Sequence, residues 1–279
     1  MHLISRCLSG AAFLALGATS AQADLLEEAT ESGEITIGIA NEAPYGYVTP
    51  EGELTGEAPE IAKHILAEMG IENVEAVVTE FGSLIPGLNA GRFDMVAAGM
   101  FITPQRCEQV AFSEPTYGIG QAFLVAEGNP ESLTTYDDIK ASSDATLAVM
   151  AGAIERTYAR DADVPDDQVM VVPDTAAGTA AVQAGRADAF ALTSLSIRRL
   201  ADGAEGVEMA GAFSEVAGQS VKGHGGFAFR PDDQAFLDAF NAELAEFIGT
   251  EEHLALVAPF GWTKDELPEK TTEELCAEQ

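Results

Sequence analysis

The residue with the clearest chemical role is Arg106, in the stretch "AAGMFITPQRC" directly after an apolar run. Basic side chains are scarce, because the chain has 14 Lys and Arg against 46 Asp and Glu. The planar guanidinium fork of arginine binds a carboxylate through two parallel hydrogen bonds. An ordinary surface salt bridge is the alternative, since acids are plentiful. The position after a strand-like run favours a ligand carboxylate as the partner of Arg106.

Three aromatic residues, Tyr45, Phe81 and Phe101, stand at or just after the ends of expected strands, and the acidic Glu42 stands near the first of them. Ring faces attract a cation of diffuse charge by about 0.5–2 kcal/mol each. Any one of these rings could equally belong to a core. Together with Arg106 and Glu42 they predict a box that holds a carboxylate at one end and a cationic group at the other.

The sequence contains no recognised catalytic motif. There is no Gly-x-Ser-x-Gly, His-Glu-x-x-His or Walker loop. The three histidines beyond the N-terminal segment, at 64, 224 and 253, are too scattered for a metal site. We therefore expect a binding protein rather than an enzyme, with no cofactor and no metal.

Strand and helix patterns alternate in two similar sets, which predicts an α/β fold with mainly parallel sheets. The sets span residues 34–99 and 144–193, and "AGRFDMVAAG" (90–99) matches "AGRADAFALT" (184–193) in position. We expect one lobe for each set. A ligand between such lobes would lie at the carboxyl ends of the strands.

The predicted boundaries follow from this repetition. Residues 24–127 and 223–279 are expected to form lobe 1, and residues 128–222 to form lobe 2. The chain would pass between the lobes near 125–129 and 218–225, where Gly or Glu residues allow hinges.

The N-terminal residues 1–23 have the pattern of a secretory signal peptide, with cleavage after Ala23. Their removal deletes Arg6 and no acid, so the net charge moves from −32 to −33. Such a charge argues against nucleic acids and anionic lipid surfaces as partners. No later segment reaches the ~18 apolar residues of a membrane span. We expect an exported periplasmic chain that is not embedded in the membrane.

Two cysteines remain after processing, Cys107 and Cys276. In an oxidising compartment they could form a disulfide, which would tie the C-terminal tail to the segment just after Arg106. Two free thiols are the alternative.

The stretches "GSLIPGLNAGRFDMVAAGMFITPQR" and "VAFSEPTYG" resemble the signature of periplasmic solute-binding proteins that serve polar-amino-acid ABC importers. The resemblance extends over nearly the whole mature chain. Within that family, "NEAPYGY", "LTGEAPEIA" and "TEFGSLIPGLNAGRFDM" are most similar to members that bind ectoine and hydroxyectoine. The resemblance implies a two-lobed clamp of the type II class, which closes on its ligand.

The resemblance also implies roles for individual residues. Arg106 would bind the ligand carboxylate, and Thr103 with the main chain of Gly99 and Phe101 would complete that anion site. Gly152, at the start of the helix expected over 153–161, would offer backbone N–H groups to the same carboxylate. Tyr45 and Phe81 would hold the ligand body between their rings, and Phe101 would form a third wall. Glu42 would face the positively charged nitrogens of the ligand.

Thr193 departs from the pattern of amino-acid binders, which usually have an Asp at this place to receive an α-ammonium group. Ala153 likewise replaces a usual Ser or Thr. The missing charge favours a zwitterion with a delocalised cation, such as ectoine or hydroxyectoine, although betaines also fit. We expect a monomeric receptor that delivers this ligand to ABC permease subunits without converting it. The alternatives are a polar amino-acid or betaine receptor and a periplasmic cyclic-acid dehydratase, for which Glu42 would be the acid.

Overall fold

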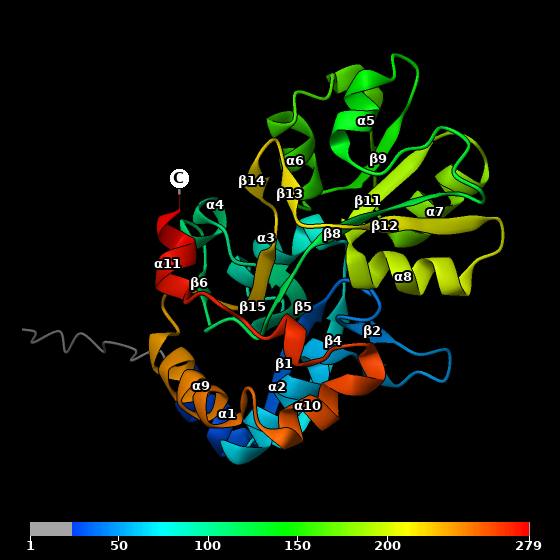
Figure 1. Cartoon of the computed structure of the whole chain (residues 1–279). Helices are drawn as coiled ribbons and strands as arrows, with labels where there is room; N and C mark the ends of the chain where they lie inside the picture. Colours follow the sequence, from blue (N-terminus) through cyan, green and yellow to red (C-terminus); the bar gives the residue numbers. More distant parts are fainter. Residues whose placement is uncertain (1–23, 279) are drawn as a thin grey trace, which may run out of the picture.

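The computed structural model describes residues 24–278, and the expected signal peptide at 1–23 lies outside this range. The chain folds into two α/β lobes, each built on its own sheet, which confirms the predicted fold class (Figure 1). Among the described residues, no helix is long and apolar enough to cross a membrane. The α-helices are α1 (Leu25–Ser32), α2 (Glu57–Glu68), α3 (Leu84–Asn89), α4 (Pro104–Cys107), α5 (Tyr136–Ala141), α6 (Glu155–Asp161), α7 (Thr175–Gln183), α8 (Ser194–Gly203), α9 (Gln234–Phe247), α10 (Glu251–Val257) and α11 (Thr272–Ala277).

The first sheet has the strand order β4-β1-β5-β15-β6, and β7 also pairs with β15. Strands β1, β4 and β5 are parallel, whereas β15 is antiparallel to β5, so the sheet is mixed rather than mainly parallel. The carboxyl ends of the three parallel strands therefore meet at one edge. The strands are β1 (Glu34–Ile39), β4 (Asn73–Val78), β5 (Met95–Phe101), β6 (Ala111–Phe112), β7 (Tyr117–Ile119) and β15 (Gly223–Phe229).

The second sheet has the order β10-β9-β11-β8-β12. It repeats the first design, because three parallel strands are followed by β8, which is antiparallel to β11. Its strands are β8 (Gln121–Ala126), β9 (Leu147–Met150), β10 (Val169–Val172), β11 (Ala189–Thr193) and β12 (Val207–Phe213). Two small hairpins complete the strands, β2 (Tyr47–Val48) with β3 (Leu54–Thr55) and β13 (Glu215–Val216) with β14 (Gln219–Ser220).

Strand β8 belongs to the second sheet, so the expected first crossing at 125–129 is wrong. The run "QAFLVA" is apolar on both faces and five of its six residues are buried, a pattern that suits the middle of either sheet. The chain instead crosses at Gly120, and we propose 24–119 with 223–278 as lobe 1 and 121–213 as lobe 2, joined on the return by the segment 214–222.

The two crossings lie side by side. Ile119 pairs with Gly223 in the first sheet, and Gln121 pairs with Phe213 in the second. The lobes are therefore joined by two neighbouring strands, an arrangement suited to hinge bending.

Helix α2 illustrates how the sequence builds the first lobe. Ile61 and Ile65 recur at helical spacing and are fully buried with Leu66, and the helix packs on β5 and α9. This packing fixes the start of α2 against the loop after β1, where the backbone N–H of Ala58 donates to the carbonyl of Tyr45 at 2.9 Å. The core of lobe 1 thus positions one wall of the cleft.

Candidate functional site

A cavity of about 30 Å³ lies between the two lobes. Its walls come from the loops after β1 and β4, from the end of β5 with α4, and from β9, the start of α6 and the end of β11. The carboxyl ends of parallel strands from both sheets thus face each other. The lining residues are Glu42, Tyr45, Phe81, Gly99, Phe101, Arg106, Met150, Ala153, Ile154, Glu155, Leu192 and Thr193, which include seven of the nine residues expected from the sequence.

Arg106 is held by both lobes. Its Nη1 donates to the carbonyl of Phe101 at 2.7 Å, and its Nη2 donates to the carbonyl of Gly152 in lobe 2 at 3.0 Å. The guanidinium carbon also lies 5.4 Å from the centre of the Phe81 ring, within cation–π range. Among the described residues, no carboxylate lies within ion-pairing distance of Arg106. Its positive charge is therefore left without an ionic partner among these residues.

Thr103 and Gly152 do not line the cavity, although both form hydrogen bonds with Arg106. Thr103 caps α4 by accepting a hydrogen bond from the backbone N–H of Arg106. Helix α6 begins at Glu155, so the expectation of a helix from 153 onward, just after Gly152, is wrong. Gly152 has a positive φ of 77°, and a Cβ there would lie 2.5 Å from the Cα of Gly82. A glycine is thus required where the lobes approach.

Three buried rings form the wall of the box. Tyr45, Phe81 and Phe101 line the cavity and are at most 8% exposed. Tyr45 is in turn backed by Tyr117 and Trp262, whose ring centres lie 5.4 and 5.5 Å from its own. The backing rings fix the plane of Tyr45 before a ligand arrives.

Gly99 completes this wall from behind. Its φ is 62°, and a Cβ at this position would overlap the ring of Tyr45. Its carbonyl accepts a hydrogen bond from the hydroxyl of Tyr117 at 2.6 Å. The absence of a side chain at Gly99 is therefore what lets Tyr45 lie flat against β5.

Two buried acids, one from each lobe, face the same cavity. Burial raises the pKa of Glu42 to about 7, although a hydrogen bond from Ser196 opposes the rise. Burial also raises the pKa of Glu155 to about 8, and the charge of Glu42 adds to the rise while that of Arg106 opposes it. The amide of Gln121, oriented to donate, reaches Glu155 Oε1 at 2.9 Å. Both carboxyls can therefore change protonation near neutral pH.

Direct hydrogen bonds join the two walls. The hydroxyl of Tyr45 donates to Thr193 Oγ1 at 2.9 Å, and the hydroxyl of Ser196 donates to Glu42 Oε1 at 2.7 Å. Thr193 also caps α8 by accepting from the backbone N–H of Ser196. Thr193 thus contributes a neutral hydroxyl to the cleft, and its oxygen accepts two hydrogen bonds from the protein.

Residues 35–261 match the family model of bacterial extracellular solute-binding proteins, family 3. The chain belongs to this family. The match spans both lobes and the whole cavity lining.

Two relatives that are similar in sequence are both named for the binding or transport of amino acids. The chain is 39% identical to the probable amino-acid ABC transporter periplasmic-binding protein y4tE of Sinorhizobium fredii (strain NBRC 101917 / NGR234), over 97% of this chain and 92% of the relative. It is 27% identical to the lysine/arginine/ornithine-binding periplasmic protein of Escherichia coli (strain K12), over 73% and 78%.

Two solved structures with a similar fold carry different ligand descriptions. The crystal structure of EhuB in complex with hydroxyectoine aligns with a TM-score of 0.84 at 38% identity, covering 92% of this chain and 99% of that one. The ancestral amino acid-binding protein AncCDT-1, a precursor of cyclohexadienyl dehydratase, aligns with a TM-score of 0.74 at 28% identity, covering 84% and 98%.

Sequence reasoning missed three contributors to this family 3 cleft: Glu155, Ser196 and Trp262. Glu155 is the first residue of a short helix, where an acid is ordinarily read as helix stabilisation. Ser196 and Trp262 act through Glu42 and Tyr45 across long sequence separations, which no local pattern reveals. Only Glu155 had a signal in the sequence, as an acid three residues after the expected Gly152.

A third buried acid, Glu57, lies behind the aromatic wall. It lines a small second cavity with Trp262 and His253, and its Oε1 accepts from the hydroxyl of Thr116 at 2.8 Å. Burial raises its pKa to about 8. Within the described residues, no group of three or more His, Cys, Asp or Glu is placed to hold a metal ion. Burial therefore favours the neutral form of the Glu57 carboxyl at pH 7, because it raises the pKa.

Glu57→Gln should make the folded protein less sensitive to alkaline pH. The folded-state pKa of about 8 exceeds the ordinary value of 4.5. The stabilising contribution of the neutral acid is therefore complete below pH 4.5 and is lost as the pH rises toward 8. Glutamine stays neutral, so the free energy of unfolding should fall between pH 5 and 8 with a slope smaller by about 1.4 kcal/mol per pH unit. Urea denaturation at several pH values measures this slope.

The exposed Glu68, on the same helix, provides the matched control, and Glu68→Gln should leave the slope unchanged. Equal slopes for Glu57→Gln and the wild type would show that Glu57 is ionised in the folded state.

Proposed function

We propose that this chain is the periplasmic receptor of an ABC importer and that it captures ectoine or hydroxyectoine. The observation that carries the proposal is the lining of one interlobe cavity by an unpaired guanidinium, three rings and two acids. Residues 1–23 would direct export. One chain supplies both walls of the cleft, so a monomer that docks on the permease subunits suffices.

The charges of the cavity suit a zwitterion with a cyclic amidinium. The carboxylate of such a ligand would accept hydrogen bonds from Arg106 in place of contacts with water. The amidinium spreads its charge over two ring nitrogens, whose N–H groups suit the carboxylates of Glu42 and Glu155. Its flat face suits Tyr45 and Phe81, at about 0.5–2 kcal/mol for each cation–π contact.

A polar amino acid is the second candidate, supported by the names of relatives such as the Escherichia coli lysine/arginine/ornithine-binding protein. A compact α-ammonium group needs a localised acid close by, and either Glu42 or Glu155 could supply it. The neutral Thr193, already bonded to Tyr45, weighs against this candidate because it adds no charge at the cleft.

A ligand screen decides between these candidates. Residues 24–279 would be purified, unfolded and refolded to remove carried ligand, and tested by thermal shift and calorimetry against ectoine, hydroxyectoine, glycine betaine, glutamine, histidine and arginine. We expect the two ectoines to bind most tightly and to be recovered unchanged, as judged by NMR. Binding of an amino acid that ectoine cannot displace would reverse the order, and chemical conversion of the ligand would instead support a dehydratase.

Arg106→Ala should weaken ectoine binding by well over tenfold. Removing one partner of a buried charged pair costs about 3–5 kcal/mol, because the other charge is left without compensation. Isothermal titration calorimetry measures the affinity. Arg160→Ala is the matched control, because Arg160 is exposed and forms an ion pair with the neighbouring Asp161. An unchanged affinity for Arg106→Ala would remove this guanidinium from the site.

Ectoine affinity should rise with pH between about 6 and 9. The raised pKa values of Glu42, about 7, and Glu155, about 8, leave both acids partly protonated in the free protein at neutral pH. A cationic ligand favours their carboxylate forms, so binding should release protons. The affinity would then gain up to about tenfold per pH unit for each proton released.

Calorimetry in two buffers of different protonation enthalpy counts the released protons at pH 7. Glu155→Gln should bind more weakly and release fewer protons than the wild type. A binding enthalpy independent of the buffer, with a flat affinity from pH 6 to 9, would contradict this charge assignment.

A further inference from the structure

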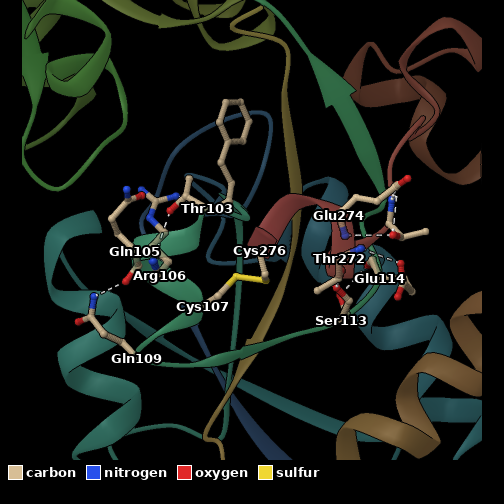
Figure 2. Close-up of a disulfide and its surroundings, with 12 residues drawn as sticks. Thr103, Gln105, Arg106, Cys107, Gln109, Ser113, Glu114, Thr272, Glu274 and Cys276 are labelled. Atoms are coloured by element: carbon tan, nitrogen blue, oxygen red, sulfur yellow. Dashed lines mark hydrogen bonds between the residues drawn. A yellow bond between two sulfur atoms is a disulfide. The ribbon is translucent and has the colours of Figure 1, made fainter. Parts of the chain in front are cut away.

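The disulfide between Cys107 and Cys276 joins α4 to α11 across a sequence separation of 169 residues (Figure 2). Cys107 is the residue directly after Arg106, and it ends the single helical turn of α4. The bond therefore attaches the C-terminal helix to the short segment that carries the guanidinium of the cleft.

Helix α4 has few other attachments. It spans four residues, begins with a proline and has no buried residue of its own. Its hydrogen bonds are mostly local. The backbone N–H of Cys107 donates to the carbonyl of Thr103, and the side-chain amide of Gln109 donates to the carbonyl of Gln105 (Figure 2). One turn of helix is not stable by itself, because the cost of fixing its backbone exceeds the gain from so few bonds.

Helix α11, by contrast, is firmly attached to lobe 1. The hydroxyl of Thr272 donates to the carbonyl of Ser113 at 2.5 Å, and its backbone N–H donates to Glu114 Oε2 at 3.1 Å (Figure 2). Ser113 is in turn bonded to β15 through Phe227 at 2.9 and 3.0 Å. Leu275 of α11 is only 4% exposed. The tail therefore provides a fixed support to which α4 can be fastened.

The guanidinium needs this support because its hydrogen bonds end in two different lobes. Its Nη1 reaches the carbonyl of Phe101 and its Nη2 that of Gly152. A small rotation of α4 about its own axis would move both nitrogens away from these carbonyls and from the cavity.

We propose that the Cys107–Cys276 disulfide positions Arg106, so that the oxidation state of this pair sets the affinity for the ligand carboxylate. Reduction by a dithiol would transfer two electrons and two protons to the S–S bond, giving two thiols and the oxidised cyclic disulfide of the reagent. Lobe 1 keeps its fold through the contacts of α9 and α11, while α4 loses its tether. The affinity part of this proposal rests on the proposed function of the cleft.

The first test needs no ligand. Amide hydrogen exchange at Arg106, Cys107 and Val110, whose N–H groups donate within or just after α4, reports whether the turn is held. We expect exchange at these amides to accelerate at least tenfold in Cys107→Ser/Cys276→Ser relative to the oxidised wild type, in excess of any change at the amides of β1. Unchanged relative protection would overturn the proposal whether or not ectoine binds.

The second test separates positioning from general destabilisation. Ectoine affinity is measured for the wild type, for Cys107→Ser/Cys276→Ser, for Arg106→Ala and for the triple variant. Loss of the disulfide should weaken binding about tenfold when Arg106 is present, because one charge-assisted hydrogen bond is loosened, and less than twofold when it is absent. Equal losses in both backgrounds would overturn the proposal.

Phe240→Leu is the control for stability, since Phe240 is fully buried far along the chain in α9 and should lower stability without changing the ectoine affinity of the folded protein. Dithiothreitol should reproduce the effect in the wild type and have none on the double serine variant. Failure of every variant to bind ectoine would instead reject the proposed function, while the exchange result would still decide the role of the disulfide.

Discussion

The structure depends on one half-buried positive charge that pairs with no carboxylate of the described residues. The guanidinium of Arg106 donates to a carbonyl of each lobe and lies against the Phe81 ring, but these groups supply only partial negative charge. A charge removed from water remains costly until an anion pairs with it. Under the proposed function, the cleft is pre-organised for a carboxylate, and an anionic group that bridges the lobes would gain from contacts that neither lobe offers alone.

The acidic residues of this protein fall into two groups, which differ in their exposure to water. Most of the 46 Asp and Glu residues, which with 14 Lys and Arg give the formal net charge of −32, are not among the buried residues. Glu42, Glu57 and Glu155 are almost fully buried, and the loss of hydration raises the pKa of each into the neutral range. Two of them face the ligand cavity and one supports its aromatic wall. The site thus combines a fixed positive charge with negative charges that form when a cation is present.

Much of the fold and of the cavity lining could be predicted from the sequence. The features that could not be predicted were missed for physical reasons. Periodicity and the repeated "AGR" segments predicted both lobes, and strand ends located five of the lining residues. Gly99 and Thr193 were expected from the family resemblance alone. The place of β8 could not be predicted, because a strand buried on both faces carries no sign of which sheet it joins. Ser196 and Trp262 were missed since they act on other side chains, and Glu155 because its position is also that of an ordinary helix-stabilising acid.

The pairing of Gln121 with Phe213 makes the second lobe a self-contained insertion whose two ends are neighbours. Such a segment can be lost, replaced or exchanged between homologues without rethreading the rest of the chain. Arg106 and the three rings would stay behind, whereas Glu155 and Thr193 would travel with the exchanged segment. Exchange of this segment would therefore alter one wall of the cleft, including Glu155 and Thr193, while the wall with Glu42, Arg106 and the rings is kept.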